Sequence, residues 1–281
     1  MVAAGGFVSA RQRRLGAVAL NVLAPAGAAV RWGFAYLAAT TGAEMLVALV
    51  DARAGVSAHI VVLLALLVHG ARGREREQRL FWALTLGPLI RIMSLSLPLG
   101  RVPIVWWYAL ISVPLFVATA LTIRALAYRP AEVGLRLQLA DIPTQLLIAL
   151  VGLPLGVVEY IILQPVPLAR ELSLAAIWLP GVILLISTGF LEEIIFRGVL
   201  QRASSEAIGP FGGPLLISML FTALHIGYKS WLDLVFVFAA GSLFAFFAAR
   251  TRSIWGVTLA HGLVNSVLFL IGPFVLGGTA V

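Results

Sequence analysis

Residues 173–196 read SLAAIWLPGVILLISTGFLEEIIF, a run that is apolar over most of its length. A helix of about 20 apolar residues crosses the hydrocarbon core of a bilayer, so this run predicts a transmembrane helix. The whole chain has the same character, because 61% of its 281 residues are hydrophobic and only 11% are charged. Such a composition cannot cover a water-facing surface, which excludes a soluble enzyme and a disordered tail.

The predicted fold class is all-α, a polytopic transmembrane helix bundle of about eight to nine spans. Nine apolar stretches support it, at residues 32–50, 56–71, 80–98, 102–123, 143–163, 173–196, 211–228, 231–249 and 254–276. We interpret a further apolar run at 15–30 as an interfacial helix, with a signal-peptide core and an extra span as the alternatives. The absence of cysteine excludes disulfides, thiol nucleophiles and cysteine metal sites.

The orientation follows from the basic residues, which favour the cytoplasmic side. If the N-terminus is cytoplasmic and the loops alternate, fifteen of the 20 Lys and Arg residues fall in inner loops and four in outer loops. We therefore predict a multi-pass protein of the cell membrane with a cytoplasmic N-terminus. The net charge of +8 favours anionic membrane lipid as a partner. The basic loops are short and lack interleaved aromatic residues, so no nucleic acid is expected as a partner.

The longest polar connection lies at residues 124–141 and divides the chain. Residues 1–130 form an N-terminal transmembrane region to which the sequence assigns no role. Residues 131–281 form a C-terminal transmembrane region with polar clusters on three separate apolar spans. An ionisable group within a span is costly to bury, so these clusters are candidates for a functional site.

Other ionisable residues within the predicted spans have simpler interpretations. Glu44 and Arg91 can pair across helices. His59 and His69 lie near opposite ends of a short span, where their rings can reach the membrane interface. Glu159 lies near the outer end of its span, where its carboxylate is expected to reach water.

The first cluster contains two adjacent carboxylates, Glu192 and Glu193, followed by Arg197. Glu193 and Arg197 are four residues apart, so they meet on one helix face and can form an ion pair. Glu192 points about 100° away and lacks this partner. A carboxylate that is buried beside a like charge accepts a proton readily, which makes Glu192 a candidate general base.

The second and third clusters supply two histidines and an amide. Phe221 and His225 share one helix face, as do His261 and Asn265. Each pair alone could be structural. A rise of about 1.5 Å per residue from the cytoplasmic loops places Glu192, His225, His261 and Asn265 at similar depths, roughly 14–20 Å. Four polar groups at similar depth predict one polar intramembrane cavity, open to the cytoplasm.

Three short motifs make this region recognisable. EEIIFR at 192–197 matches EExxxR, FTALH at 221–225 matches FxxxH, and HGLVN at 261–265 matches HxxxN. In this order the motifs resemble the CPBP family of intramembrane proteases, which includes the type II CAAX prenyl endopeptidases and the bacterial Abi-type proteins. The resemblance covers about residues 130–270 and does not extend to the first four spans.

The resemblance implies a role for each motif residue. Glu192 would activate a water molecule, helped by His225. His261 and Asn265 would donate hydrogen bonds to the oxyanion of the tetrahedral intermediate. The supporting residues would be Glu193, Arg197 and Phe221.

The resemblance also favours a mechanism without a cofactor. Two histidines and one glutamate could alternatively bind zinc, although the chain has no HExxH pair on one helix. We therefore expect a hydrolase, an intramembrane endopeptidase similar to CAAX prenyl protease 2, whose substrate is a membrane-associated or lipid-modified peptide or protein. Two alternatives stay open: a non-catalytic bacteriocin-immunity or peptide-binding membrane protein, and a proton-coupled transporter that uses Glu44, Arg91 and Glu159.

Overall fold

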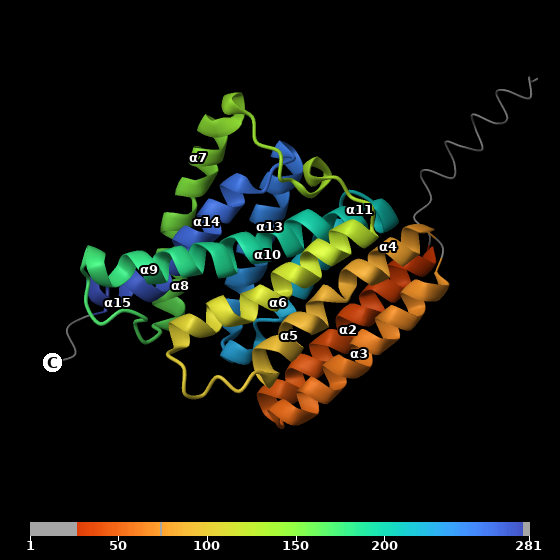
Figure 1. Cartoon of the computed structure of the whole chain (residues 1–281), viewed down its shortest axis with the longest axis horizontal. Coiled ribbons are helices and arrows are strands. Elements are labelled where there is room, and N and C mark those ends of the chain that lie inside the picture. The colour runs from red at the N-terminus through yellow and green to blue at the C-terminus, as the bar shows by residue number, and fades with distance from the viewer. Residues whose placement is uncertain (1–26, 74, 278–281) are drawn as a thin grey trace, which may run out of the picture.

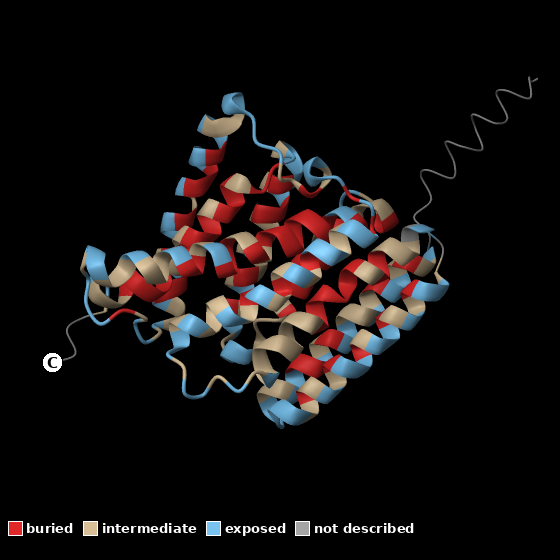
Figure 2. Cartoon of the chain, viewed as in Figure 1, coloured by how far each residue is buried: buried red, intermediate tan, exposed pale blue. Residues whose placement is uncertain are grey.

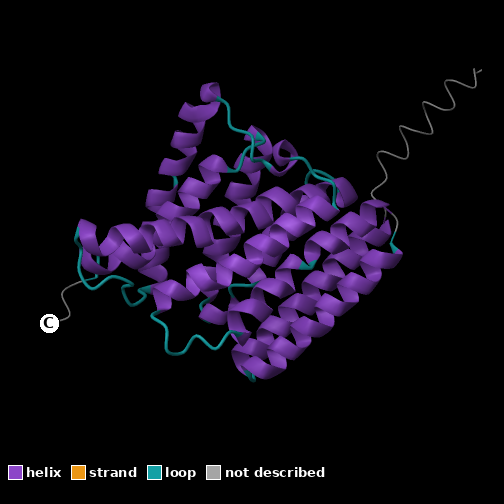
Figure 3. Cartoon of the chain, in the orientation of Figure 1, coloured by secondary structure: helices purple, strands orange, loops and turns teal. Residues whose placement is uncertain are grey.

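The computed structural model describes residues 27–73 and 75–277. These residues form helices joined by loops, with no strand among them (Figure 3). The predicted all-α class is therefore confirmed. Most of the predicted interfacial helix at 15–30 lies outside the described residues, and residues 27–30 begin the first described helix.

The helices of the N-terminal half lie side by side (Figure 1). They are α2 (Gly27–Leu49), α3 (Ala52–Arg72), α4 (Glu75–Leu84), α5 (Leu86–Ser96) and α6 (Ile104–Ala125). The sharp turn between α2 and α3 ends at Asp51, whose carboxylate accepts a hydrogen bond from the Arg53 N–H at 2.7 Å. This cap satisfies a backbone donor at the start of α3.

The C-terminal half is built around one long helical rod from Leu174 to Ile208. The rod consists of α9 (Leu174–Leu184), the π-helical segment η3 (Leu185–Phe190), α10 (Leu191–Glu193), the π-helical segment η4 (Ile194–Leu200) and α11 (Gln201–Ile208). The other α-helices are α7 (Ile142–Leu150), α8 (Gly152–Leu163), α12 (Gly212–Ala223), α13 (Trp231–Thr251), α14 (Trp255–Ser266) and α15 (Gly272–Val275). Shorter 3₁₀ and π segments are η1 (Pro130–Val133), η2 (Leu139–Asp141), η5 (Ile226–Tyr228) and η6 (Val267–Ile271).

Six helices in the described part of the chain are long and apolar enough to cross a membrane. They cover Ala52–Arg72, Ile104–Ala125, Leu139–Leu163, Leu174–Ile208, Trp231–Thr251 and Trp255–Val275. Each coincides with a predicted span, which makes this a multi-pass membrane protein.

The other three predicted spans take different forms, so the predicted count of eight to nine is not confirmed. The stretch 32–50 lies in α2 up to Leu49, where that helix ends. The stretch 80–98 is divided between α4 and α5 at Thr85, and 211–228 forms a shorter apolar helix over Gly212–Tyr228.

Helix α14 packs closely against the rod, and small residues allow the approach. A Cβ atom at Gly189 would lie 2.9 Å from the carbonyl oxygen of Thr258 on α14. A Cβ atom at Gly256 would lie 2.6 Å from the side-chain oxygen of Gln145 on α7. These glycines let backbones approach as small residues do between membrane helices, and the first brings α14 beside the two glutamates.

One apolar core joins both halves of the chain, with Leu66, Leu80, Ile195 and Leu216 among its buried members. Figure 2 shows the buried residues concentrated along the central rod and on the inward faces of its neighbours. Large apolar side chains such as Val61 and Val113 lie exposed on outer faces, as expected for surfaces in contact with lipid. The division of the chain into an N-terminal region at 1–130 and a C-terminal region at 131–281 that carries the candidate site stays a prediction.

Candidate active site

Glu192 and Glu193 lie in α10, a single helical turn between two π-helical segments. Such segments recur at functional sites, because an inserted residue re-aims the side chains beside it. Glu193 is fully buried and accepts a hydrogen bond at 2.8 Å from Nη1 of Arg197. The predicted ion pair is therefore present. Glu192 points elsewhere, with 29% of its side chain exposed.

Arg197 is enclosed on all sides that the structure describes. Its side chain is 1% exposed, and Nη2 donates a hydrogen bond to the carbonyl oxygen of Gly241 at 3.2 Å. The guanidinium carbon lies 4.5 Å from the ring centre of Phe221 and 5.7 Å from that of Phe244. Cation–π contact and hydrogen bonds together stabilise the buried charge.

His261 lies between the two glutamates. Its Nδ1 is 2.8 Å from Oε1 of Glu193, and its Nε2 is 3.9 Å from Oε2 of Glu192. Oε1 of Glu193 already accepts a hydrogen bond from Arg197, and a carboxylate oxygen accepts in the second contact too, so we assign the proton to Nδ1 of His261. The ring is therefore fixed by one carboxylate and presents Nε2 toward the other.

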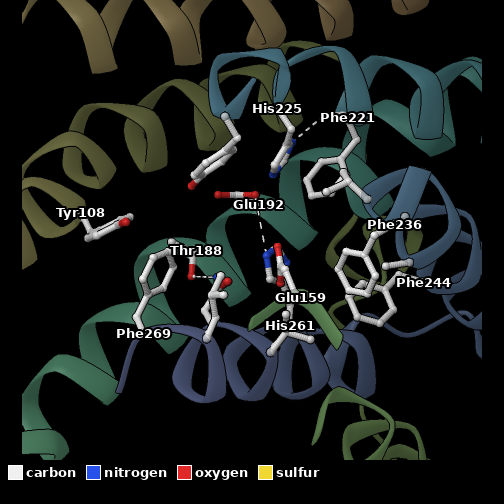
Figure 4. A pocket seen from close by; sticks show the side chains of 17 residues that line it. Tyr108, Glu159, Thr188, Glu192, Phe221, His225, Phe236, Phe244, His261 and Phe269 are labelled. Atoms are coloured by element: carbon white, nitrogen blue, oxygen red, sulfur yellow. Dashed lines mark hydrogen bonds and ion pairs between the residues drawn. The ribbon is translucent and has the colours of Figure 1, made fainter. Parts of the chain in front are cut away.

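His225 approaches the same place from α12, in the turn directly after its last helical residues. Its Nδ1 lies 2.8 Å from the carbonyl oxygen of Phe221, which can only accept, so Nδ1 carries the proton and Nε2 is left as an acceptor. Figure 4 shows the His225 ring and the Glu192 carboxylate pointing toward one another. The Phe221 ring lies 4.7 Å from the His225 ring and 6.1 Å from the His261 ring, so it packs against both.

Asn265 follows His261 by one helical turn on α14, as the spacing predicts. Its Nδ2 donates a hydrogen bond to Oγ1 of Thr188 at 2.8 Å. Thr188 in turn donates to the carbonyl oxygen of Leu184. This chain fixes the amide plane and leaves the second hydrogen of Nδ2 for a ligand.

One cavity brings the predicted residues together (Figure 4). Glu192, His225, His261 and Asn265 all line it, and so does Phe221. They come from α10, the end of α12, and α14, so three elements distant in sequence converge on one polar space. Glu193 and Arg197 lie directly behind it.

The same cavity contains four polar residues that sequence reasoning did not assign to the site: Tyr108, Glu159, Thr188 and Tyr228. The prediction that Glu159 reaches water was wrong, because the residue is buried and its carboxylate faces the cavity. Tyr228 follows His225 by three residues, a spacing that could have suggested it. Tyr108 comes from α6, and no local pattern connects it with the site.

A second buried cluster lies in the N-terminal half. Nε of Arg91 donates a hydrogen bond to Oε1 of Glu44 at 2.5 Å, so the predicted pairing is confirmed. His59 was expected at the interface, and this was wrong: its ring is fully buried, with Nε2 2.9 Å from Oε1 of Glu44. His69 is partly buried, with Nδ1 3.1 Å from the hydroxyl of Tyr36.

Zinc is the alternative cofactor for this cavity. Within residues 27–73 and 75–277, no three His, Asp or Glu side chains are arranged to hold a metal ion. Glu193 is bound to Arg197 and His261, and Nδ1 of His225 is bonded to the backbone. A histidine that binds zinc through one ring nitrogen commonly donates a hydrogen bond from the other, so these contacts do not exclude zinc at Glu192, His225 and His261.

Comparisons with known proteins agree with the motifs. Residues 174–267 match the model of the family described as Rce1-like, type II CAAX prenyl endopeptidase. This range contains all three motifs, so the resemblance to the CPBP family is confirmed. A Bacillus subtilis (strain 168) protein named "Putative membrane peptidase YdiL" is 36% identical over 80 residues, which cover 28% of this chain and 32% of that protein. The match thus spans about a third of this relative's length, and no solved structure matches the chain.

Proposed function

We propose that this protein is an intramembrane endopeptidase, since residues 174–267 match the model of the Rce1-like family of type II CAAX prenyl endopeptidases. It hydrolyses a peptide bond in a membrane-associated or lipid-modified peptide or protein, in the manner of CAAX processing. The observation that carries the proposal is the position of His261, held by Glu193 at 2.8 Å and facing Glu192 at 3.9 Å in a cavity shared with His225 and Asn265.

The first step is attack by water. A water molecule between Glu192 and Nε2 of His225 gives its proton to the Glu192 carboxylate, while its oxygen forms a bond to the carbonyl carbon of the substrate. The two protein groups suit this role because they point toward one another and because Nε2 of His225 has no hydrogen of its own (Figure 4). No metal takes part in this mechanism.

The second contribution is stabilisation of the oxyanion that forms on the carbonyl oxygen. The free hydrogen on Nδ2 of Asn265 and a proton on Nε2 of His261 can both be donated to it. A doubly protonated His261 faces a carboxylate on each side, which stabilises its charge. Donors fixed in advance in a low-dielectric cavity stabilise developing charge more than water does.

The intermediate then collapses with cleavage of the C–N bond. The proton held by Glu192 passes to the leaving nitrogen, so that a carboxylic acid and an amine are formed and Glu192 is ionised again. Glu193 and Arg197 touch no reacting atom in this scheme. They are positioning residues, because they fix the His261 ring through its Nδ1.

The location is part of the same proposal. The excess of arginine in one set of loops supports a cell-membrane protein whose N-terminus and cavity opening face the cytoplasm. The cytoplasmic side is also where a lipid-modified peptide would be presented.

The test is cleavage of a prenylated peptide by purified protein in lipid vesicles. Wild type is compared with Glu192→Gln and His225→Ala, and with Glu171→Gln as a control on an exposed carboxylate before α9. We expect cleavage by wild type and the control, with and without a chelator, and none by the two site variants. Equal rates for all four proteins would overturn the proposal. A protein that binds the peptide without any cleavage would favour the peptide-binding alternative.

A further inference from the structure

A second cavity adjoins the first. The two cavities share the lining residues Tyr108, Thr188, Glu192, Phe221, His225 and Tyr228. Glu192 and His225 therefore stand at the boundary between two spaces. The second space extends toward α5 and α6, which belong to the N-terminal region that no motif covers.

The walls of this second cavity are mostly apolar. Ile90, Ile111, Leu115, Leu191, Ile195 and Leu224 all line it. Ligand sites commonly combine such walls with a few placed polar groups that fix orientation. On the side of α5 the polar residues are Arg91 and Ser94, and only Arg91 carries a charge.

Arg91 is anchored through Nε, which leaves Nη1 and Nη2 able to bind a ligand. Its Nε is bonded to Glu44, which is completely buried, whereas 18% of the Arg91 side chain is exposed and the residue lines the cavity. No described residue accepts a hydrogen bond from Nη1 or Nη2 of Arg91. One edge of the guanidinium is thus anchored, and the other can form two parallel hydrogen bonds with an anion.

The guanidinium also lies close to the catalytic residues in space. A Cβ atom at Gly227 would lie 3.7 Å from Nη2 of Arg91, and Gly227 is two residues after His225. The anion-binding edge is therefore beside the turn that carries His225. A peptide with its end at Arg91 would lie along apolar walls and pass Glu192.

We propose that Arg91 binds the free C-terminal carboxylate of the substrate, with the apolar side chains of its last residues in the second cavity. This inference rests on the proposed peptidase function and adds a specificity-determining residue to it. It also gives the N-terminal region a role, since α2 and α5 supply the anchored arginine. A lipid phosphate offers similar anionic oxygens, and the experiment separates these two sources.

The experiment compares two forms of one prenylated peptide, with a C-terminal carboxylate or a C-terminal amide, in vesicles of neutral phosphatidylcholine. A bidentate, charge-assisted pair predicts a preference for the acid of about 10- to 100-fold in kcat/KM for wild type, mainly through KM. In Arg91→Gln the ratio falls to near one.

Arg91→Gln leaves the buried Glu44 charge without its arginine and could unfold, so a double variant is included. Glu44→Gln/Arg91→Gln removes both charges, and thermal unfolding verifies that it is folded. It too is expected to lose the preference for the acid, whereas Arg91→Lys retains part of it. Arg101→Gln, on an exposed loop arginine, is the matched control and keeps the full preference.

The outcomes distinguish the two proposals. Wild type that cleaves acid and amide equally, with Glu192→Gln inactive, overturns the role of Arg91 and leaves the peptidase function intact. Absence of cleavage in wild type overturns the peptidase function itself. If phosphatidylglycerol vesicles raise the unfolding temperature of wild type but not of the folded double variant, while both keep the preference for the acid, Arg91 binds lipid and the proposal is wrong.

Discussion

Two buried clusters in this molecule have the same composition and different surroundings. In each, a completely buried glutamate oxygen contacts an arginine and a histidine: Glu193 with Arg197 and His261, and Glu44 with Arg91 and His59. In the first cluster the arginine is enclosed and the histidine faces a cavity. In the second the histidine is enclosed and the arginine faces a cavity.

Residue type alone therefore does not determine what each buried cluster does in this protein. A buried glutamate–arginine–histidine group can fix a ring that faces a second carboxylate, as His261 does with Glu192. The same group can instead fix a cation at the wall of an apolar space, as Glu44 does with Arg91. The role of each cluster depends on which of its side chains has polar atoms that face a cavity: His261 in the first cluster and Arg91 in the second.

The largest effect on cleavage is expected at Glu192, the carboxylate that His261 of the first cluster faces. In Glu192→Gln we expect cleavage to fall by about 10² to 10⁴, because a general base is lost. The unfolding temperature should change little, since no hydrogen bond of Glu192 is present in the described structure. Peptide cleavage and thermal unfolding measure the two effects, and a rate within tenfold of wild type would contradict the assignment.

The next effect compares the two arginines. Arg197→Met leaves Glu193 as a buried charge without its cation, and removal of one partner of such a pair costs about 3–5 kcal/mol. Arg91→Met should cost less, because 18% of that side chain is already exposed, against 1% for Arg197. Unfolding free energies of the purified variants test this order. A greater loss of unfolding free energy for Arg91→Met than for Arg197→Met would contradict the order expected from the burial of the two side chains.

The third prediction compares Asn265, the proposed oxyanion donor, with Thr188, which accepts a hydrogen bond from it. Asn265→Ala should lower kcat by about 10² to 10³ with little change in KM, as expected for a donor used only in the transition state. Thr188→Val removes only the acceptor that orients the amide, so its effect on kcat should be smaller. Steady-state kinetics of both variants measure this, and a larger loss for Thr188→Val would be inconsistent with a donor role for Asn265.

The smallest effect is expected at an exposed pair of the same kind. Glu132 lies in the polar connection at residues 124–141. The Arg129 backbone N–H and then its guanidinium donate hydrogen bonds to the Glu132 carboxylate, which lower the pKa of this carboxyl below its ordinary value of 4.5. A lowered pKa stabilises the folded state above pH 4.5, and the contribution is lost as the pH falls through the folded-state value.

Glu132→Gln should therefore lower the unfolding temperature slightly at pH 7, and the difference from wild type should shrink at acidic pH. Because the Arg129 side chain is 82% exposed, the change should be well below that of either buried arginine. Thermal scans across pH test the sign. A difference that grows as the pH falls would show that the pKa is not lowered.

Much of the site could be predicted from the sequence because its residues lie in short motifs on helices. The i, i+4 spacing placed Glu193 beside Arg197 and His261 beside Asn265 on single faces, and the structure has both arrangements. An apolar run also identifies a span from its own residues. Six predicted spans were therefore found without any knowledge of packing.

The remaining features depend on contacts between distant segments, which no local pattern encodes. Glu159 and His59 were placed near water by their distance from helix ends, but neighbouring helices bury both. Tyr108 reaches the site only because α6 packs beside the rod (Figure 1). The contact of His59 with Glu44 likewise requires the pairing of α2 with α3.

Hydrolysis in water enriched in ¹⁸O, followed by mass spectrometry of the products, tests most directly whether Glu192 delivers the attacking water. Wild type should place one ¹⁸O atom in the newly formed carboxyl group of the amino-terminal product, and Glu192→Gln should form no product in the same time. Labelled product from Glu192→Gln at the wild-type rate would contradict the proposed role of this carboxylate.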